Sequence, residues 1–251
     1  MKKNLNKDEL ERYSRQIVLK NIGIIGQKKI INTKILIIGA GGLGCPIIDN
    51  LSRSGVKNIT VADYDKVDLS NLHRQTMYNT KDIGKFKVDV IKSKIKKINP
   101  NSKINTIKEK IIEKNLSKII KKFDILVDGS DNFKTKFLLN DYSIKYKKIL
   151  IVGAISKFDG HVFSFNFKKY KTPCLKCFYQ TEPSDDILDC ESEGIIGTTA
   201  NIIGSIQANE VLKNILNIKN SLENSILIIN LLKLNLRKIT FEKKRSCTSC
   251  K

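Results

Sequence analysis

The feature that most limits what this chain can fold into is the glycine loop Gly39–Gly44, whose sequence is Gly-Ala-Gly-Gly-Leu-Gly. An apolar run at Lys34–Ile38 leads into the loop, as expected for a strand buried on both faces of a parallel sheet. After the loop, residues 47–51 place apolar side chains at helical spacing, and Asn58–Asp63 is predicted to be the next strand. The order strand, glycine turn, helix, strand predicts a βαβ unit.

Elements further along the chain extend this unit. The first 33 residues are predicted to be helical and polar, and a second helix from Gly84 is expected to stop at the breaker Asn99-Pro100. The segment His161–Phe167 alternates strictly between polar and apolar residues, which predicts a half-buried, antiparallel strand. The remaining expected elements are strands near 104–107, 124–127 and 149–152, a long polar loop at 178–198, a helix near 200–216, and a hairpin at 226–231 and 234–241.

The predicted fold class is therefore α/β. We expect a Rossmann-like, mostly parallel sheet with helices on both faces, a C-terminal antiparallel extension and, from the cysteines discussed below, a structural zinc site. The chain length of 251 residues suits one large domain of this class.

The glycine loop also predicts a nucleotide site. Gly39, Gly41 and Gly44 satisfy the pattern G-x-G-x-x-G, in which glycines let the backbone approach a phosphate at a helix N-terminus, and Gly42 lies within it. Asp63 closes the following strand, where a carboxylate can bond a ribose hydroxyl. A glycine turn that binds nothing is the alternative. Taken alone, the pattern would make a nicotinamide-dependent dehydrogenase the default.

Three polar residues that follow Asp63 in the sequence favour a triphosphate as the ligand instead of a dinucleotide. Asn71 and Arg74 lie in a polar loop beyond the carboxyl end of a predicted strand, and Lys87 begins the next helix, at the edge where doubly wound sheets bind ligands. Two cations converging on a glycine loop would stabilise charge on a transferring phosphoryl group. The alternative is that both are ordinary surface cations. It is stronger for Lys87, because the chain has 46 basic residues and only six of them are arginine.

The segment Asp128–Asn132 ends another apolar strand and should face the same crevice. Asp131 could hold Mg²⁺, which prefers one or two carboxylates together with phosphate oxygens. The alternative is a helix cap, since Asp and Asn are both strong N-cap residues and a helix is predicted from Phe133. Asp131 and Asn132 can divide the two tasks between them.

Four of the six cysteines form two C-x-x-C pairs, Cys174 with Cys177 and Cys247 with Cys250. Four thiolates at this spacing make a closed tetrahedral zinc site, which is structural because it leaves no position open for a substrate. Such a site contributes on the order of 10 kcal/mol to folding. A redox dithiol is the alternative for either pair taken alone.

Cys190 stands apart from these pairs, in the long polar loop beside Asp189 and Glu191. A lone cysteine is more often inert than nucleophilic, and neighbouring carboxylates disfavour a thiolate. Its place on a long loop suggests the other possibility, a thiol that attacks an acyl intermediate. Both interpretations stay open.

Composition limits the partners and the location that we expect. The formal net charge of +21 would suit a nucleic-acid-binding protein, but the charge is mostly lysine and no basic block carries interleaved aromatic residues. We therefore favour a solvated lysine-rich surface and expect no nucleic-acid partner. No apolar run reaches the roughly 18 residues of a membrane span. The lysine-rich segment Met1–Glu11 has no apolar segment behind it, unlike a signal peptide, so we expect a soluble cytoplasmic protein.

Together these motifs resemble those of one family. The chain is similar to the bacterial molybdopterin-synthase adenylyltransferases and their thiazole-biosynthesis counterparts, which are prokaryotic relatives of the ubiquitin-activating enzymes. The resemblance extends from about Leu10 to Cys250. The motifs that carry it are Arg12–Gln16, the glycine loop, Asp63 with Asp65, Ser70–Gln75, Lys87, Asp131 with Asn132, and both C-x-x-C pairs.

The resemblance implies an ATP-dependent adenylyltransferase. Its substrate would be a ubiquitin-like sulfur-carrier protein ending in Gly-Gly, whose terminal carboxylate attacks the α-phosphate of Mg-ATP and displaces pyrophosphate. It also implies a single adenylation domain, 1–251, with a helical segment at 1–33, a nucleotide-binding half at 34–155 and a carrier-binding half at 156–251 that holds a crossover loop and the zinc site.

Roles follow from matching positions. The glycine loop would contact the nucleotide and Asp63 its ribose, Asn71, Arg74 and Lys87 would hold the phosphates, and Asp131 the magnesium. Arg15 would reach the phosphates of the other protomer, because the family forms homodimers with shared sites. Cys190 matches a loop cysteine that is linked to sulfur transfer in the thiazole branch.

The carrier itself stays open. We expect the small subunit of molybdopterin synthase, and the thiamine-thiazole sulfur carrier is the alternative. A separate sulfurtransferase or cysteine desulfurase is expected, since the chain stops one residue after Cys250. An NAD-dependent oxidoreductase is a distant alternative, and a zinc-stabilised nucleic-acid-binding module is a third.

Overall fold

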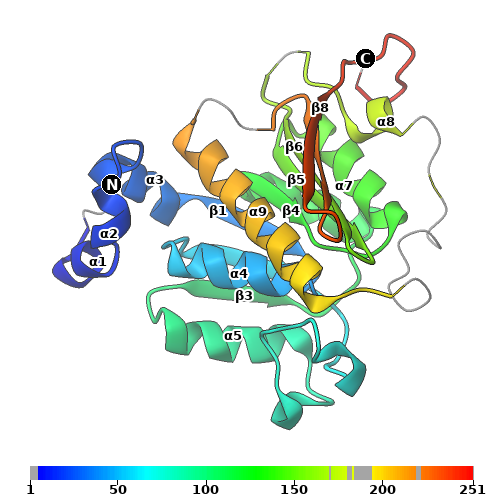
Figure 1. Cartoon of the computed structure of the whole chain (residues 1–251). Coiled ribbons are helices and arrows are strands. Elements are labelled where there is room, and N and C mark those ends of the chain that lie inside the picture. The colour runs from blue at the N-terminus through cyan, green and yellow to red at the C-terminus, as the bar shows by residue number, and fades with distance from the viewer. Residues whose placement is uncertain (1–4, 170, 180–182, 184–193, 219–221, 251) are drawn as a thin grey trace.

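The computed structural model describes residues 5–169, 171–179, 183, 194–218 and 222–250. Its strands form one eight-stranded sheet in the order β3-β2-β1-β4-β5-β6-β7-β8 (Figure 1). Neighbours from β3 across to β5 are parallel, and those from β5 to β8 are antiparallel. The strands are β1 (Lys34–Ile38), β2 (Asn58–Ala62), β3 (Lys103–Ile107), β4 (Ile125–Asp128), β5 (Ile149–Ser156), β6 (Asp159–Asn166), β7 (Ser225–Asn230) and β8 (Asn235–Thr240).

Helices cover both faces of this sheet. In β1, Ile35 and Ile37 join an apolar core with α4, α5 and α9, whereas Leu36 and Ile38 join a second core with α6 and α7. A strand with both faces buried needs an unbroken apolar run, which is why the sequence before the glycine loop does not alternate. The predicted fold class is confirmed. The helices are α4 (Gly44–Arg53), α5 (Lys87–Ile98), α6 (Glu113–Ile119), α7 (Phe133–Lys145), α8 (Leu175–Phe178) and α9 (Gly197–Leu216), with 3₁₀ turns at Leu69–Asn71, Thr80–Asp82 and Ile120–Lys122.

The N-terminal segment folds as the three helices α1 (Lys7–Arg12), α2 (Ser14–Ile17) and α3 (Gly23–Asn32), as predicted. It is joined to the carboxyl ends of α4 and α5 by polar contacts. The buried Tyr13 hydroxyl accepts a hydrogen bond from Asn99 Nδ2 at 2.9 Å, and Gln16 donates to the Ser54 carbonyl at 2.8 Å. The segment therefore lies at the end of α4 opposite the glycine loop.

The strand β6 corrects one prediction. It is antiparallel, as expected, but the expectation that it is half-buried is wrong, because the side chains from Val162 to Phe165 are all buried. Helix α9 packs on one face of β6, and the rings of Phe178 and Phe241 pack edge-on against Phe163 on the other. Polar residues in this strand are buried with partners, as when the Ser164 hydroxyl accepts from Asn214.

The remaining expectations concern the loop at 178–198, the start of α9, membrane spans and the division of the domain into halves. Most of the predicted loop at 178–198 lies outside the described residues, and α9 begins at Gly197, slightly earlier than predicted. Among the residues that the structure describes, no helix is both long enough and apolar enough to cross a bilayer. The division into a nucleotide-binding half and a carrier-binding half stays a prediction.

Candidate functional site

A pocket opens at the carboxyl edge of the parallel strands, where the loops after β1 and β4 meet. The strand order reverses between these two strands, and doubly wound sheets bind ligands at such a point. The structure brings nearly all of the predicted nucleotide-binding residues to this pocket. Those that line it are Gly39, Gly41, Gly42, Asp63, Asn71, Arg74, Lys87 and Asp131.

The glycine loop packs closely against its neighbours. Gly39 has φ +91°, and a Cβ built there would lie 2.5 Å from the Gly129 carbonyl oxygen, so the loops after β1 and β4 touch through their backbones. A Cβ on Gly44 would lie 2.1 Å from the Gly39 oxygen, which gives Gly44 a role in closing the turn. Gly44 begins α4 but does not line the pocket. A Cβ on Gly41 would meet only the Gln75 amide within 4 Å, at 3.7 Å, so the backbone at Gly41 is open to a ligand.

Asp63 is held by the backbone around it. One carboxylate oxygen accepts the Ala40 N–H at 2.7 Å and the other accepts the Asp65 N–H at 2.8 Å. Burial raises the pKa of Asp63 above its usual value, and the positive charge of Lys87 opposes that shift. The carboxylate is thus fixed next to the glycine loop, where a ribose hydroxyl could donate to it.

The two predicted cations reach the pocket from different elements. Lys87, the first residue of α5, is buried and its Nζ lies 3.0 Å from Asp65 Oδ2. Arg74 donates to the Ser70 carbonyl at 2.9 Å and contacts the His73 ring, and its stem lies against Gly42. Both cations are therefore held by local partners that a phosphate could replace.

The helix cap falls to Asn132 and Asp131 lies at the pocket, where its expected magnesium role stays a prediction. Asn132 is the N-cap of α7, and its side chain accepts the Thr135 N–H at 2.9 Å. Asp131 is exposed and lines the pocket, and its carboxylate accepts a hydrogen bond from the Asn132 amide at 3.2 Å. A carboxylate so placed can take a cation together with phosphate oxygens.

A buried lysine below this loop was not predicted from the sequence. Lys136 is 1% exposed, and its Nζ lies 2.9 Å from the carboxylate of the fully buried Asp128 at the end of β4. A signal was present, because Phe133, Lys136 and Phe137 share the i, i+3, i+4 spacing of the buried face of α7. A lysine within an apolar stripe marks either a break in the stripe or a paired buried charge.

Arg15, which was predicted to reach the phosphates of the other protomer, does not lie at the pocket of its own chain. Arg15 lies in α2, next to Gln16, which bonds the residue that follows the far end of α4. Because α4 has 10 residues, that end lies about 15 Å from the glycine loop at the helical rise of about 1.5 Å per residue. Cys190 lies outside the described residues, so its role stays a prediction.

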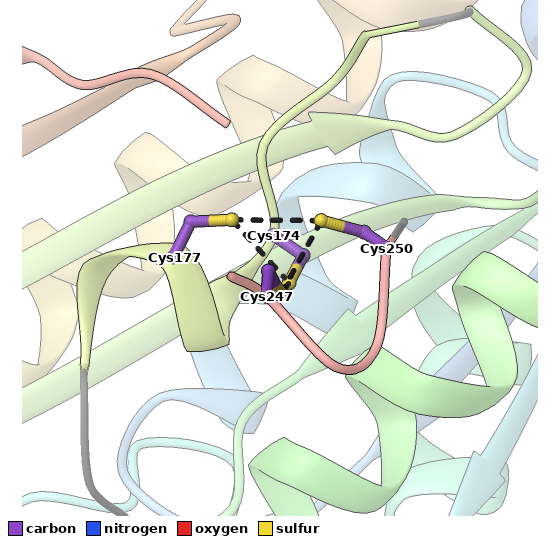
Figure 2. Close-up of side chains that lie close together, drawn as sticks. All are labelled: Cys174, Cys177, Cys247 and Cys250. Atoms are coloured by element: carbon purple, nitrogen blue, oxygen red, sulfur yellow. Dashed lines mark hydrogen bonds between the residues drawn. The ribbon is translucent and has the colours of Figure 1, made fainter. Parts of the chain in front are cut away.

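The four paired cysteines form a cluster where α8 meets the C-terminal segment (Figure 2). Cys174 and Cys177 flank the start of α8, and Cys247 and Cys250 come from the C-terminal segment. The Sγ–Sγ distances are 3.9 Å within the first pair, 3.5 Å within the second, and 3.6 and 3.5 Å between pairs. Tetrahedral zinc with Zn–S bonds of about 2.3 Å needs sulfurs about 3.8 Å apart, so the cluster can hold zinc.

Electrostatics in the cluster also suit a cation. Burial and then the neighbouring Cys177 raise the pKa of the Cys174 thiol to about 12. Burial would likewise raise the pKa of Cys247, but the N–H groups of Cys250 and Ser249 directed at its sulfur lower it to about 7. Four adjacent sulfurs cannot all ionise unless positive charge is added, which a metal ion would supply.

Comparison with known proteins agrees with this architecture. A model of the ThiF family matches residues 13–250. Over 235 residues the chain is 41% identical to the "Probable molybdopterin-synthase adenylyltransferase" of the red alga Gracilaria tenuistipitata var. liui, covering 94% of this chain and 66% of that protein. It is 34% identical over 248 residues to the "Sulfur carrier protein adenylyltransferase" of Thermus thermophilus, covering 97% and 92%.

Some relatives are longer, and solved structures share the fold. The chain is 34% identical to the "Adenylyltransferase and sulfurtransferase MOCS3" of Anopheles gambiae and spans 56% of its length. The crystal structure of Escherichia coli MccB with ATP superimposes with a TM-score of 0.83 at 23% identity, covering 95% of this chain and 74% of that one. At this level of identity the superposition shows the fold alone.

Proposed function

Because the chain belongs to the ThiF family, we propose that it is an ATP-dependent adenylyltransferase that activates the C-terminal glycine carboxylate of a ubiquitin-like sulfur-carrier protein. One observation carries the proposal: the glycine loop, Arg74, Lys87 and Asp131 converge on a single pocket at the strand-order reversal. A site for a dinucleotide needs the glycine loop and an acidic residue on the ribose, but it does not need two cations and a second carboxylate at the phosphates.

The reaction we propose forms one bond and breaks one bond. A carboxylate oxygen of the carrier attacks the α-phosphorus of ATP, the bond to the bridging oxygen of the β-phosphate breaks, and pyrophosphate leaves with that electron pair. Arg74 and Lys87 stabilise the negative charge that grows on the phosphate oxygens. Lys87 exchanges Asp65 for a phosphate oxygen as the nucleotide binds, while Asp63 orients the ribose.

Asp131 is the residue that would hold magnesium in this site. Its carboxylate is exposed at the pocket, while the adjoining Asn132 is committed to the cap of α7. A divalent cation at this position would neutralise the departing pyrophosphate. Asp131, from the loop after β4, and the two cations, from the segment between β2 and the start of α5, all line the pocket in which the phosphates would lie.

The four-cysteine cluster would bind zinc as a structural ion. All four ligands come from the protein, so no coordination position is open for chemistry. Zinc there would fasten the C-terminal segment to α8, on the side of the sheet away from α4 and α9.

We further propose a homodimer in which Arg15 completes the site of the partner. Within one chain, Arg15 lies at the far end of α4 from the pocket. The N-terminal segment also exposes apolar side chains, including Val18 at 76% and Ile25 at 75%, as expected of a surface that a second copy covers. A symmetric dimer exchanges such segments reciprocally.

The molybdopterin-synthase carrier is the substrate we favour, because the Gracilaria relative is named a probable molybdopterin-synthase adenylyltransferase. The same reaction on the thiamine-thiazole carrier is the alternative. Either product is a mixed anhydride of the carrier and AMP. A sulfurtransferase or a cysteine desulfurase is the class of enzyme that would replace AMP with sulfur.

The experiment is isotope exchange between pyrophosphate and ATP, run with each carrier in turn. We expect exchange only when a carrier with an intact Gly-Gly end is present, and mass spectrometry should detect the carrier-adenylate. A carrier lacking the final glycine is the control. Absence of exchange with every intact carrier would overturn the proposal, and turnover of NAD in its place would favour an oxidoreductase.

A further inference from the structure

The buried pair of Lys136 and Asp128 lies directly beneath the pocket but does not line it. Asp128 is 0% exposed and ends β4, and Lys136 projects from the buried face of α7. Removing a lysine and a carboxylate from water costs several kcal/mol per ion, and apolar residues of similar size often stabilise a fold as well or better. The pair therefore calls for an explanation other than stability.

Lys136 uses its full hydrogen-bonding capacity here. An ammonium group has three donors, and Nζ has three acceptors: Asp128 Oδ2 at 2.9 Å, the Ser130 carbonyl at 2.7 Å and the Gly153 carbonyl at 2.7 Å. The acceptors belong to the end of β4, to the loop after β4 and to the middle of β5. A single side chain thus fixes the loop to two strands of the sheet.

Asp128 fastens the same loop from the other side. Its second oxygen accepts both the backbone N–H of Ser130, at 3.0 Å, and the Ser130 hydroxyl. Ser130 is therefore held at its N–H, its hydroxyl and its carbonyl by the two members of the pair. Asp131 is the next residue, and its backbone direction is set by the peptide bond that begins at the Ser130 carbonyl.

The pair also supports the glycine loop. Gly129 lies between Asp128 and Ser130, and its carbonyl is the atom that the Cα of Gly39 approaches so closely that no Cβ would fit. A shift of the loop after β4 would therefore move the backbone against which Gly39 rests. Both pocket walls depend on where Lys136 and Asp128 hold this loop.

We propose that Lys136, acting with Asp128, is a positioning residue that holds the Gly129–Asp131 loop so that Asp131 faces the metal and phosphates of the bound nucleotide. The inference rests on the proposed function for the identity of the ligand. Lys136 differs from Lys87, whose side chain pairs with the half-exposed Asp65 and can exchange that partner for a ligand. Lys136 is enclosed and fully paired, so it stays in place throughout the reaction.

The test compares Lys136→Met, Lys136→Arg and the double variant Asp128→Asn with Lys136→Met. Loss of a residue that orients a metal ligand costs about 10- to 100-fold in metal affinity or activity, so we expect Lys136→Met to raise the Mg²⁺ concentration for half-maximal exchange by at least about tenfold. The arginine variant, which keeps the charge, should recover part of this loss. The double variant should recover the melting temperature but not the Mg²⁺ dependence, because it removes the uncompensated charge and leaves the loop unfastened.

Lys134→Met is the matched control, because Lys134 is exposed on the same helix and should leave the Mg²⁺ dependence unchanged. Hydrogen exchange of peptides spanning 128–133 provides a measurement that needs no activity. These amides should exchange faster in the methionine and double variants than in the wild type, while α9 stays unchanged. Wild-type loop protection together with wild-type Mg²⁺ dependence in a folded double variant would overturn the positioning role, whereas failure of the wild type to exchange pyrophosphate would overturn the proposed function instead.

Discussion

The nucleotide pocket and the four-cysteine cluster are built in opposite ways. At the pocket, loops are fixed by backbone contacts and by polar groups that already have partners, such as Gly39 against Gly129 and Asp63 between two N–H groups. At the cluster, four thiols that all lie within 4.8 Å of one another come from segments about 70 residues apart in sequence.

The two sites differ in whether the fold determines the site or the site holds the fold together. The pocket is a consequence of the sheet, because the loops after parallel strands all emerge at one edge. The cluster would instead hold the chain around it, since a metal ion bound to the four thiolates would fix the C-terminal segment in place. We therefore expect ligand removal to leave the pocket folded, and metal removal to loosen the cluster.

The largest effect should come from removing the metal. Structural zinc carries an apparent binding free energy on the order of 10 kcal/mol. Even a loss of about 5 kcal/mol would lower the melting temperature of a chain of this size by roughly 10–20 °C. Treatment with a zinc chelator, or the change Cys247→Ser, should release residues 241–250, as measured by calorimetry and hydrogen exchange.

If removing the metal also loosened the pocket, the two regions would not be independent. Amides of the glycine loop should keep their protection after chelation, because no cluster residue lines the pocket. Ser246→Ala, a change at the neighbouring position, is the control for Cys247→Ser and should keep both the metal and the melting temperature. Zinc content measured by mass spectrometry should be close to one ion per chain in the control and close to none in the cysteine variant.

The next largest effect should be on catalysis alone. Arg74 is partly exposed and bonds the Ser70 carbonyl and the neighbouring His73 ring, so Arg74→Ala should leave the melting temperature nearly unchanged. Removing one charge-stabilising donor costs about 10²- to 10³-fold in rate, or about 2.7–4 kcal/mol. Pyrophosphate exchange should fall by that factor. Arg53→Ala, at an exposed arginine that pairs with Asp49 on its own helix, is the control.

Mixing subunits extends the same experiment to the dimer. Arg15→Ala and Arg74→Ala should each be nearly inactive alone. If Arg15 serves the site of the partner, a mixed dimer regains one intact site, so equal mixing should restore about a quarter of the wild-type activity. No recovery from mixtures that do exchange subunits would show that Arg15 acts elsewhere.

Much of this arrangement could be predicted because it follows from local rules. The apolar run before Gly39 requires a strand buried on both faces, and carboxyl ends of parallel strands bring Asp63, Arg74 and Asp131 to one edge whatever the details of the loops. The spacing within each C-x-x-C pair likewise fixes two sulfurs to one metal ion. These signals need no knowledge of distant contacts.

The parts that were missed depend on contacts between distant elements. Lys136 is buried with full partners only because the carbonyl of Gly153 on β5 completes its hydrogen bonds. β6 alternates in sequence as a half-exposed strand would, but α9 and the ring of Phe241, both from later in the chain, cover its two faces. Periodicity describes one element at a time and cannot show which face a later element covers.

The smallest effect we expect is a pH dependence of ATP affinity that comes from Asp63. This affinity should change with pH in the opposite direction to the contribution of Asp63 to folding stability. Burial raises the pKa of Asp63 in the folded protein, so the folded state holds this proton more tightly than the unfolded chain, whose aspartates titrate near pH 3.9. The contribution of Asp63 to folding stability therefore grows as pH falls through the raised pKa. Binding should change in the opposite direction, because a protonated carboxyl loses its charge-assisted bond to the ribose.

That bond is worth about 1.5 kcal/mol, so the dissociation constant of ATP should rise by roughly tenfold as Asp63 is protonated. Calorimetric titration with ATP across this pH range would measure the change. Asp63→Asn should bind ATP with the weak affinity at every pH, and Asp49→Asn, at a partly exposed carboxylate of α4 outside the pocket lining, should behave as the wild type. If affinity and stability instead fell together with pH in the wild type, the pocket would be losing its fold rather than one hydrogen bond, and the contrast with the cysteine cluster would not hold.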